Sequence, residues 1–417
     1  MRKAPFMIGF ILAAAGLPAA WLDFPLGPDR SGLALPVMGD FAESIGPSLI
    51  SYGAAAGLFL IGGLISWLRS RPKISGFMAA GLFLLVLTVP LQVAYGKPGW
   101  LRALAFEHEQ QRNILHFSNR YLQPNRGSEP DFRPGLNLET VPDRLGSAWK
   151  FLAIGWYCAM AGGLMMILAA AARLPVHEAR RQIFLPTPAA YGLLLLIFVF
   201  RPLMAEAQLR QAEIAMSHGR SVEAASRYQK AAVWDAWYPS DPESLRRIGG
   251  LHAGLGRTDT GEYHLYQGYR FENQDNDSLA RFEYQRAAEQ ATTSRIGREE
   301  AARLAIKKGL QQYADGETFS ATAAWEDAMG KNPSQIQPLY YLAQAYYVQS
   351  SYRKAIEMNQ RLTQRVSNRL ILAQIYANMG DGYQKLGEFE QARNYYRLSL
   401  QMDRQQNFRA LASLAGI

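Results

Sequence analysis

The chain has 417 residues, of which 49% are hydrophobic and 19% charged, and its formal net charge is +9. Residues 1–204 hold 18 Lys and Arg against 11 Asp and Glu (net +7), and residues 205–417 hold 26 against 24 (net +2). A basic excess beside apolar runs is typical of membrane-helix flanks, so a nucleic-acid partner is not indicated. The single cysteine, Cys158, excludes an intrachain disulfide, and the six scattered histidines predict no metal site.

Five apolar segments in the first half are each about long enough to cross a hydrocarbon core of ~30 Å. They are residues 6–22, 48–68, 75–95, 148–172 and 184–204. None has an Asp, Glu, Lys, Arg or His near its middle, where a proton relay or an ion-coupled transporter keeps such groups. We therefore expect residues 1–204 to form a transmembrane helix bundle of about five spans that does not transport ions by itself.

The basic residues between these segments predict an orientation, because Lys and Arg are retained on the cytoplasmic side. They gather before the first span, between spans two and three, and between spans four and five: Arg2, Lys3, Arg69, Arg71, Lys73, Arg173, Arg180 and Arg181. The loop at residues 23–47 has one arginine and four acidic residues. This pattern predicts a multi-pass protein of the bacterial inner membrane, with a cytoplasmic N-terminus and its second half in the periplasm. Two alternatives stay open: a first segment that is a cleaved signal peptide, and an inverted topology.

Residues 96–147 form the longest expected loop, on the external side. Within it, residues 100–122 have apolar residues with charges between them: Leu101, Leu104, Ile114, Leu115, Phe117 and Tyr121. This pattern predicts an amphipathic helix at the membrane interface.

The run from His116 to Gln123 resembles the histidine-containing external loop of O-antigen ligase and polymerase glycosyltransferases. The resemblance implies a loop in which His116 and Arg120 handle a lipid-linked glycan. Ser118 stands where that family has a second histidine.

From residue 205 onward, amphipathic helices alternate with short turns. The last of them contain Met379-Gly380, Tyr383, Gly387, Phe389, Ala392 and Tyr396. This order resembles the tetratricopeptide repeat (TPR), in which helix pairs stack into a solenoid. Related positions recur at a TPR-like period, so we expect residues 205–417 to hold about five repeats. We also expect an irregular helix near residues 273–298 and a capping helix at residues 407–417.

The TPR resemblance implies a protein-binding groove lined by the first helix of each repeat. Carried onto this sequence, the candidate groove residues are Arg303, Ile306, Leu310, Tyr313, Gln337, Tyr340, Gln344, Tyr347, Gln384 and Lys385. Their aromatic and amide side chains suit an extended peptide or an apolar helix better than an acidic carboxyl terminus.

No nucleophile elbow, phosphate-binding loop or zinc-protease motif occurs in the sequence, so no catalytic residue is assigned. The leading hypothesis is a non-enzymatic scaffold, without cofactor, that binds protein partners of a cell-envelope complex through the repeats and membrane-embedded subunits through the bundle. The alternative is a component of a lipid-linked glycan ligase or polymerase that uses the loop at residues 96–147.

Overall fold

The structure is a computed structural model that describes residues 4–35, 51–96, 100–122, 136–235, 237–238, 241–403 and 408–415. It is almost wholly helical, which confirms the expected all-α fold class. The chain divides into two compact units. The bundle unit is Met1–Phe106 with Gly135–Glu206, and the repeat unit is Glu107–Pro134 with Ala207–Ile417. The chain therefore changes unit between Glu206 and Ala207, and also inside the expected external loop.

The first apolar segment of the bundle unit is shorter than expected. Helix α1 (Ala4–Gly16) ends before Pro18, because proline disfavours a helical conformation in the residue before it. The indole nitrogen of Trp21 donates a hydrogen bond of 2.8 Å to the carbonyl of Gly16, which satisfies one group at the helix end. Strand β1 (Ala20–Leu22) then pairs antiparallel with β2 (Arg30–Ser31).

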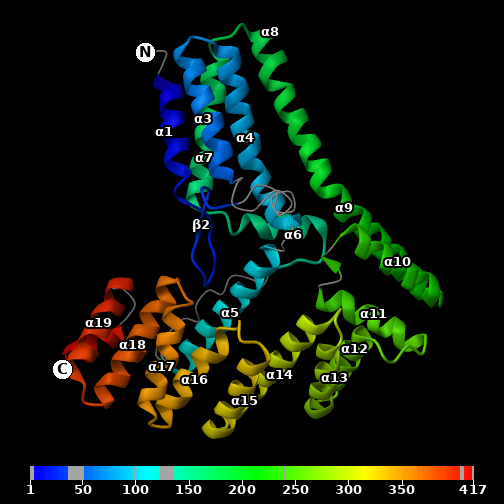
Figure 1. The fold of residues 1–417 in the computed structure, drawn as a ribbon, viewed down its shortest axis with the longest axis vertical. Helices are drawn as coiled ribbons and strands as arrows, with labels where there is room; N and C mark the ends of the chain where they lie inside the picture. The colour runs from blue at the N-terminus through cyan, green and yellow to red at the C-terminus, as the bar shows by residue number, and fades with distance from the viewer. Residues whose placement is uncertain are drawn as a thin grey trace. The chain divides into compact units, whose positions relative to one another are not determined.

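The remaining apolar segments form longer helices (Figure 1). These are α3 (Tyr52–Leu68), α4 (Pro72–Tyr95), α7 (Ile154–Ala171) and α9 (Pro186–Ser217), the last preceded by α8 (Val176–Ala179) and a π-helical turn, η1 (Arg180–Phe184). Among the described residues, three stretches are long and apolar enough to cross a membrane: Pro72–Tyr95, Ile154–Ala171 and Val176–Ser217. Helices α1 and α3 are apolar but shorter. About five spans were expected, and three stretches meet the length that a span requires.

Helices α1 and α7 approach each other closely along a stripe of glycines. A Cβ atom at Gly162 would lie 2.5 Å from the backbone nitrogen of Ala13 and 2.6 Å from the carbonyl oxygen of Gly9. Further along the same crossing, a Cβ at Gly16 would lie 2.7 Å from the carbonyl of Gly155. Small residues at such crossings let the two backbones pack directly, which is how helices associate in lipid.

Helix α4 contains Pro90, whose missing N–H leaves the carbonyl of Val86 without its usual helical donor. The indole nitrogen of Trp156 in α7 supplies the replacement, a hydrogen bond of 2.9 Å to that carbonyl. Nearby, the hydroxyl of Tyr52 donates to Gln92 Oε1 at 2.7 Å and lies 2.8 Å from Thr88 Oγ1. These buried polar groups are uncharged and hydrogen-bonded, as an apolar surrounding requires.

The expected external loop contains two helices, α5 (Trp100–Tyr121) and α6 (Val141–Trp149). Helix α5 begins in the bundle unit, and its residues from Glu107 onward belong to the repeat unit. The predicted helix over residues 100–122 is therefore present. The second half of α5 packs on other helices of the repeat unit, where we had expected a membrane interface.

The rest of the repeat unit is a succession of antiparallel helices. After the end of α9 they are α10 (Ser221–Trp234), α11 (Pro242–Gly254), α12 (Gly261–Glu272), α13 (Asp277–Glu289), α14 (Ser294–Ala314), α15 (Thr318–Lys331), α16 (Gln337–Val348), α17 (Tyr352–Thr363), α18 (Arg369–Lys385), α19 (Phe389–Met402) and α20 (Phe408–Ala415). Neighbours in the chain lie side by side, most clearly from α14 to α19 in Figure 1. Ala410 of α20 is buried with Ala392 and Tyr396, so α20 covers the end of the last helix pair.

Six turns between paired helices share one backbone conformation, with a residue of positive φ. These residues are Gly219, Gly256, Asp275, Gly316, Ser350 and Gly387. Seven residues before each of them stands a small residue, and nine residues after it stands a larger side chain. The small residues are Ala212, Gly249, Gly268, Gly309, Ala343 and Gly380, and the larger ones are Tyr228, Leu265, Tyr284, Trp325, Asn359 and Tyr396. This constant spacing makes the unit a TPR-like array.

Three of these pairs show why the small residue is needed. A Cβ at Gly268 would lie 2.5 Å from the ring of Tyr284, and one at Gly380 would lie 2.5 Å from the ring of Tyr396. A Cβ at Gly309 would overlap the indole of Trp325 in the same way. Each glycine therefore makes room for the aromatic ring of the second helix, whose burial supplies much of the core.

The segment near residues 273–298 differs from the irregular helix that we expected. It contains the regular helix α13 and the start of α14, and α12 with α13 repeats the spacing of the other pairs. Asp275 occupies the turn position where four other pairs have glycine, which hides the repeat in the sequence. Gly261 and Gly268 give room to Thr293 and Tyr284.

Asp275→Gly is expected to stabilise the repeat unit by about 0.5 to 1 kcal/mol. Asp275 has φ of +55°, a conformation that costs free energy for any residue with a Cβ and little for glycine. Asp277→Gly is the matched control, since Asp277 lies in the first turn of α13 and its loss should destabilise the helix. Urea unfolding followed by circular dichroism would measure both. A lower midpoint for Asp275→Gly would show that the aspartate side chain contributes more than its backbone costs.

Candidate functional site in the helical repeats

The second half of helix α5 lies against helices α14, α15 and α16 of the repeat unit. Gln110, Ile114, Phe117 and Tyr121 are three or four residues apart, so they share one face of the helix. Gln110, Ile114 and Phe117 are all buried, with at most 4% of any of these residues exposed. This stripe is the part of α5 that the repeats bind.

Phe117 is the centre of a set of aromatic rings that we call the aromatic cluster: Phe117, Tyr121, Tyr313, Trp325, Tyr340 and Tyr341. The ring centroid of Phe117 lies 4.4 Å from that of Tyr341, 5.4 Å from that of Tyr313 and 6.2 Å from that of Trp325. The tilted and edge-on arrangements are those in which aromatic quadrupoles attract, and each such pair adds about 0.5 to 1.5 kcal/mol to the burial. Phe117 therefore anchors α5 among residues of α14, α15 and α16.

Gln110 makes the polar contact at the other end of the stripe. Its Oε1 accepts hydrogen bonds from the backbone N–H groups of Ile336, at 2.6 Å, and Gln337, at 3.3 Å. The first N–H groups of a helix have no acceptor within the helix, and no side chain of the α16 N-cap residue supplies one. Gln110 therefore caps α16 from another segment of the chain, 226 residues away.

Tyr341 connects the two kinds of contact. Its hydroxyl accepts a hydrogen bond from Gln337 Nε2 at 2.9 Å and donates one to the backbone carbonyl of Asn113 at 3.2 Å. Burial raises the pKa of Tyr341, and burial also raises the pKa of Tyr313. The Tyr341 hydroxyl thus stays protonated at neutral pH, as a donor to α5 must be.

Three of the ten candidate groove residues meet α5. Tyr313 and Tyr340 belong to the aromatic cluster, and Gln337 receives the cap from Gln110. Ile306 and Gln344 are buried, and Leu310 and Tyr347 are half-buried. In the last pair, Gln384 accepts a hydrogen bond of 2.9 Å from Tyr396, and Lys385 is exposed at the end of α18.

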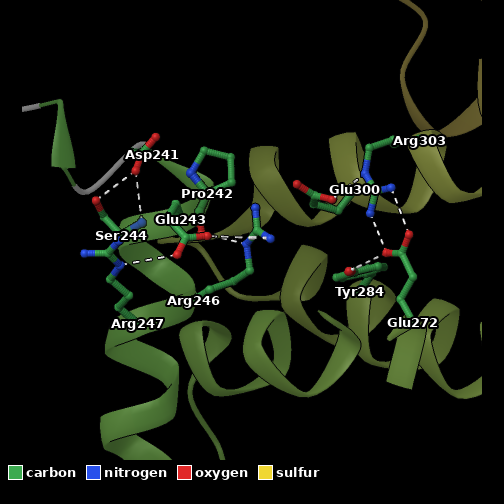
Figure 2. Close-up of polar contacts among 10 residues, drawn as sticks. All are labelled: Asp241, Pro242, Glu243, Ser244, Arg246, Arg247, Glu272, Tyr284, Glu300 and Arg303. Atoms are coloured by element: carbon green, nitrogen blue, oxygen red, sulfur yellow. Dashed lines mark hydrogen bonds and ion pairs between the residues drawn. The ribbon is translucent and has the colours of Figure 1, made fainter. Parts of the chain in front are cut away.

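Arg303, another candidate groove residue, binds acidic side chains of the repeats themselves. Its guanidinium donates to both carboxylate oxygens of Glu272 and, through Nε, to Glu300 Oε2 at 2.8 Å (Figure 2). Tyr284 donates a further hydrogen bond of 3.0 Å to Glu272. The charge of Arg303 is therefore already paired between α12 and α14, and it joins neighbouring helices of the array.

The pairing with Arg303 should make the repeat unit sensitive to acid. Burial alone would raise the pKa of Glu272, but the hydrogen bond and charge of Arg303 outweigh it and hold the pKa at about 2. A carboxyl group whose pKa falls on folding stabilises the fold above its unfolded pKa, near 4.3, and this contribution is lost as the pH falls toward 2. After allowance for screening by solvent, we expect a loss of about 1 to 2 kcal/mol between pH 5 and pH 2.

Urea unfolding at a series of pH values would measure that loss. Glu272→Gln should lower stability at pH 6 and flatten the pH dependence. Glu390→Gln is the control, because Glu390 is 81% exposed in its pair with Arg393 and should leave the profile unchanged. Equal profiles for the wild-type chain and Glu272→Gln would contradict the role of this pair.

Sequence patterns did not indicate Trp325 and Tyr341 as parts of this site, and they did not connect residues 107–121 with the repeats. The sequence did contain a signal for this site, because Gln110, Ile114, Phe117 and Tyr121 are three or four residues apart, as on the buried face of a packed helix.

His116 and Arg120, the residues of the glycosyltransferase resemblance, are exposed on α5. Among the described residues, no group of three or more His, Cys, Asp and Glu side chains could hold a metal ion.

Comparison with known proteins gives no family assignment. No protein-family model matches the chain, and no curated protein matches it. Among solved structures, it is similar to the N-terminal domain of stress-induced protein-1 from C. elegans, with 18% identity over 28% of this chain and 95% of that one and a TM-score of 0.26.

Two further solved structures are TPR proteins. YrrB, a TPR protein with an unusual peptide-binding site, is 12% identical over 49% of this chain and 89% of its own, with a TM-score of 0.25. A thermophilic TPR protein of Thermus thermophilus is 16% identical over 51% of this chain and 100% of its own, with a TM-score of 0.24. At TM-scores this low, the repeat architecture of this chain rests on its own helix pairs.

Proposed function

We propose that the protein is a non-enzymatic, membrane-anchored scaffold that binds protein partners through its helical repeats. The observation that carries this proposal is the packing of α5 on α14, α15 and α16. The repeats hold an amphipathic helix there through an aromatic anchor and a backbone cap. Recognition of this kind, a helix lying on a surface lined with apolar side chains, recurs among peptide-binding proteins.

Membrane anchoring is supported by the apolar surface of the bundle unit. Leu58 is 75% exposed, Ile154 is 69% exposed and Phe77 is 67% exposed, and each lies on an apolar helix. Water disfavours so much exposed apolar surface on adjacent helices, whereas lipid matches it. We propose that α1 and α3 complete a bundle of about five membrane helices with α4, α7 and α9, and that this bundle also contacts membrane-embedded partner subunits.

We propose that the repeats face the periplasm of a bacterial cell, where the protein serves an envelope complex as an accessory or assembly subunit. The support is the distribution of Lys and Arg in the sequence, which is asymmetric across the five apolar segments. Reporter fusions after Ile417 would test the side. A reporter active only in the cytoplasm would contradict this orientation.

Site-specific photo-crosslinking in intact membranes would test the scaffold function. A photoreactive residue at Arg353, whose side chain is 83% exposed on α17, should capture discrete protein partners, whereas one at Gly192 on α9 should capture mainly lipid or bundle partners. Partners identified by mass spectrometry should be absent from cells that lack the photoreactive residue. Absence of any protein adduct from the exposed positions of all repeat pairs would contradict the proposal.

The alternative function, a component of a glycan ligase or polymerase, has one supporting feature. His116 and Arg120 are one helical turn apart and both are exposed on α5. This alternative predicts that His116→Ala and Arg120→Ala abolish an envelope glycan while the protein level is unchanged. A normal glycan in both variants would dispose of it.

A further inference from the structure

We infer that the aromatic cluster is a binding site for an amphipathic partner helix, and that α5 is the resident helix which this partner replaces. The inference rests on the proposed scaffold function and names the chemistry of the partner. The partner presents an amide side chain, then an aliphatic residue four positions later, an aromatic residue at seven and another at eleven. Gln110, Ile114, Phe117 and Tyr121 hold these positions in α5.

The first step is that the receiving surface recognises a pattern and not a particular sequence. Tyr313, Trp325 and Tyr341 surround one aromatic ring, and the N-terminus of α16 receives one amide oxygen. These contacts involve a ring and a carbonyl, groups that other helices also carry. Buried aromatic anchors of this kind dominate the affinity of helical ligands.

The second step is that α5 fits this surface imperfectly. Ser118 is fully buried next to Phe117, and within the described part of the chain its hydroxyl has no hydrogen-bond partner. A buried polar group without a partner weakens an association by roughly tenfold or more. A helix with the same anchors and an alanine at the Ser118 position would bind this surface more tightly.

The third step concerns competition. A resident segment of the same chain has an effective concentration in the millimolar range, so a partner must bind better than α5 to replace it. The unpaired hydroxyl of Ser118 provides that margin. An imperfect resident helix keeps the aromatic rings covered until a better-matched helix arrives.

A binding experiment with the full-length chain in lipid nanodiscs would test the inference. The probe is a fluorescent synthetic peptide with the sequence of residues 107–122 carrying Ser118→Ala. Phe117→Ala in the chain removes the anchor of the resident helix, and His116→Ala, at the adjacent exposed position, is the matched control. We expect the probe to bind the Phe117→Ala chain at least tenfold more tightly than the His116→Ala or wild-type chain. Adding Tyr341→Ala to Phe117→Ala should abolish that gain.

Equal binding of the probe to the Phe117→Ala and His116→Ala chains, with circular dichroism unchanged, would overturn the inference. If Phe117→Ala does not fold, Gln110→Ala removes only the cap, and a chain that gains no affinity for the probe overturns the inference in the same way. A Phe117→Ala chain that dimerises and ignores the probe would assign the site to α5 of a second copy, and would also overturn it. Photo-crosslinking from Arg353 is independent of α5, so partners captured there would preserve the scaffold function after such a result.

Discussion

Trp325→Ala is expected to destabilise the repeat unit by about 3 to 5 kcal/mol, the usual cost of removing a fully buried large aromatic side chain. Trp325 is 0% exposed, covers Gly309, and donates a hydrogen bond of 3.3 Å from its indole nitrogen to the carbonyl of Ile306. Its ring also lies 5.5 Å from that of Tyr313 and 5.2 Å from that of Tyr341. One side chain therefore supports both a repeat pair and the surface that receives α5.

Because repeats contact mainly their neighbours, the damage should be concentrated in α14, α15, α16 and the docked half of α5. Hydrogen exchange followed by mass spectrometry would locate it, and urea unfolding would give its size. Phe319→Ala is the matched control on the same helix, since Phe319 is 77% exposed and should change stability by less than about 0.5 kcal/mol. Faster exchange spread evenly over α10 to α19, or no faster exchange in α5, would contradict this account of the site.

Gly162→Leu is expected to separate α1 from α7 and to destabilise the bundle unit by about 3 kcal/mol. A Cβ at Gly162 meets the backbone of Ala13 and Gly9 at 2.5 and 2.6 Å, and backbone atoms have no rotamer that would relieve the overlap. Loss of this close approach removes the direct packing of the α1 and α7 backbones.

Thermal unfolding of the purified full-length chain in detergent would measure this effect. Gly192→Leu is the control, because Gly192 lies on α9 with no atom within 4 Å of its Cβ position. It adds the same side chain to an apolar helix without an overlap. Equal melting temperatures for the two variants would mean that the glycine stripe does not hold α1 against α7.

Local sequence patterns were sufficient to predict most of the helices and most of the repeat pairs. Gly387 and Tyr396, with Gly380 before them, have a spacing that identifies a TPR-like pair, and the same spacing recurs where glycine holds the turn. The pattern was hidden at Asp275, because a residue other than glycine takes up positive φ there and no local rule requires it to. The end of the first apolar segment was missed because α1 stops before Pro18 and an antiparallel hairpin follows it.

The candidate site depends on contacts that local patterns do not contain. The sequence by itself predicted an amphipathic helix over residues 100–122 and showed that the first helices of the repeats carry tyrosines and glutamines. Only the tertiary structure decided that these meet, because Gln110 and Ile336 are 226 residues apart and many apolar surfaces would cover such a stripe equally well. It also decided that Arg303 pairs with Glu272, since a charged residue has several possible partners within reach and packing selects one of them.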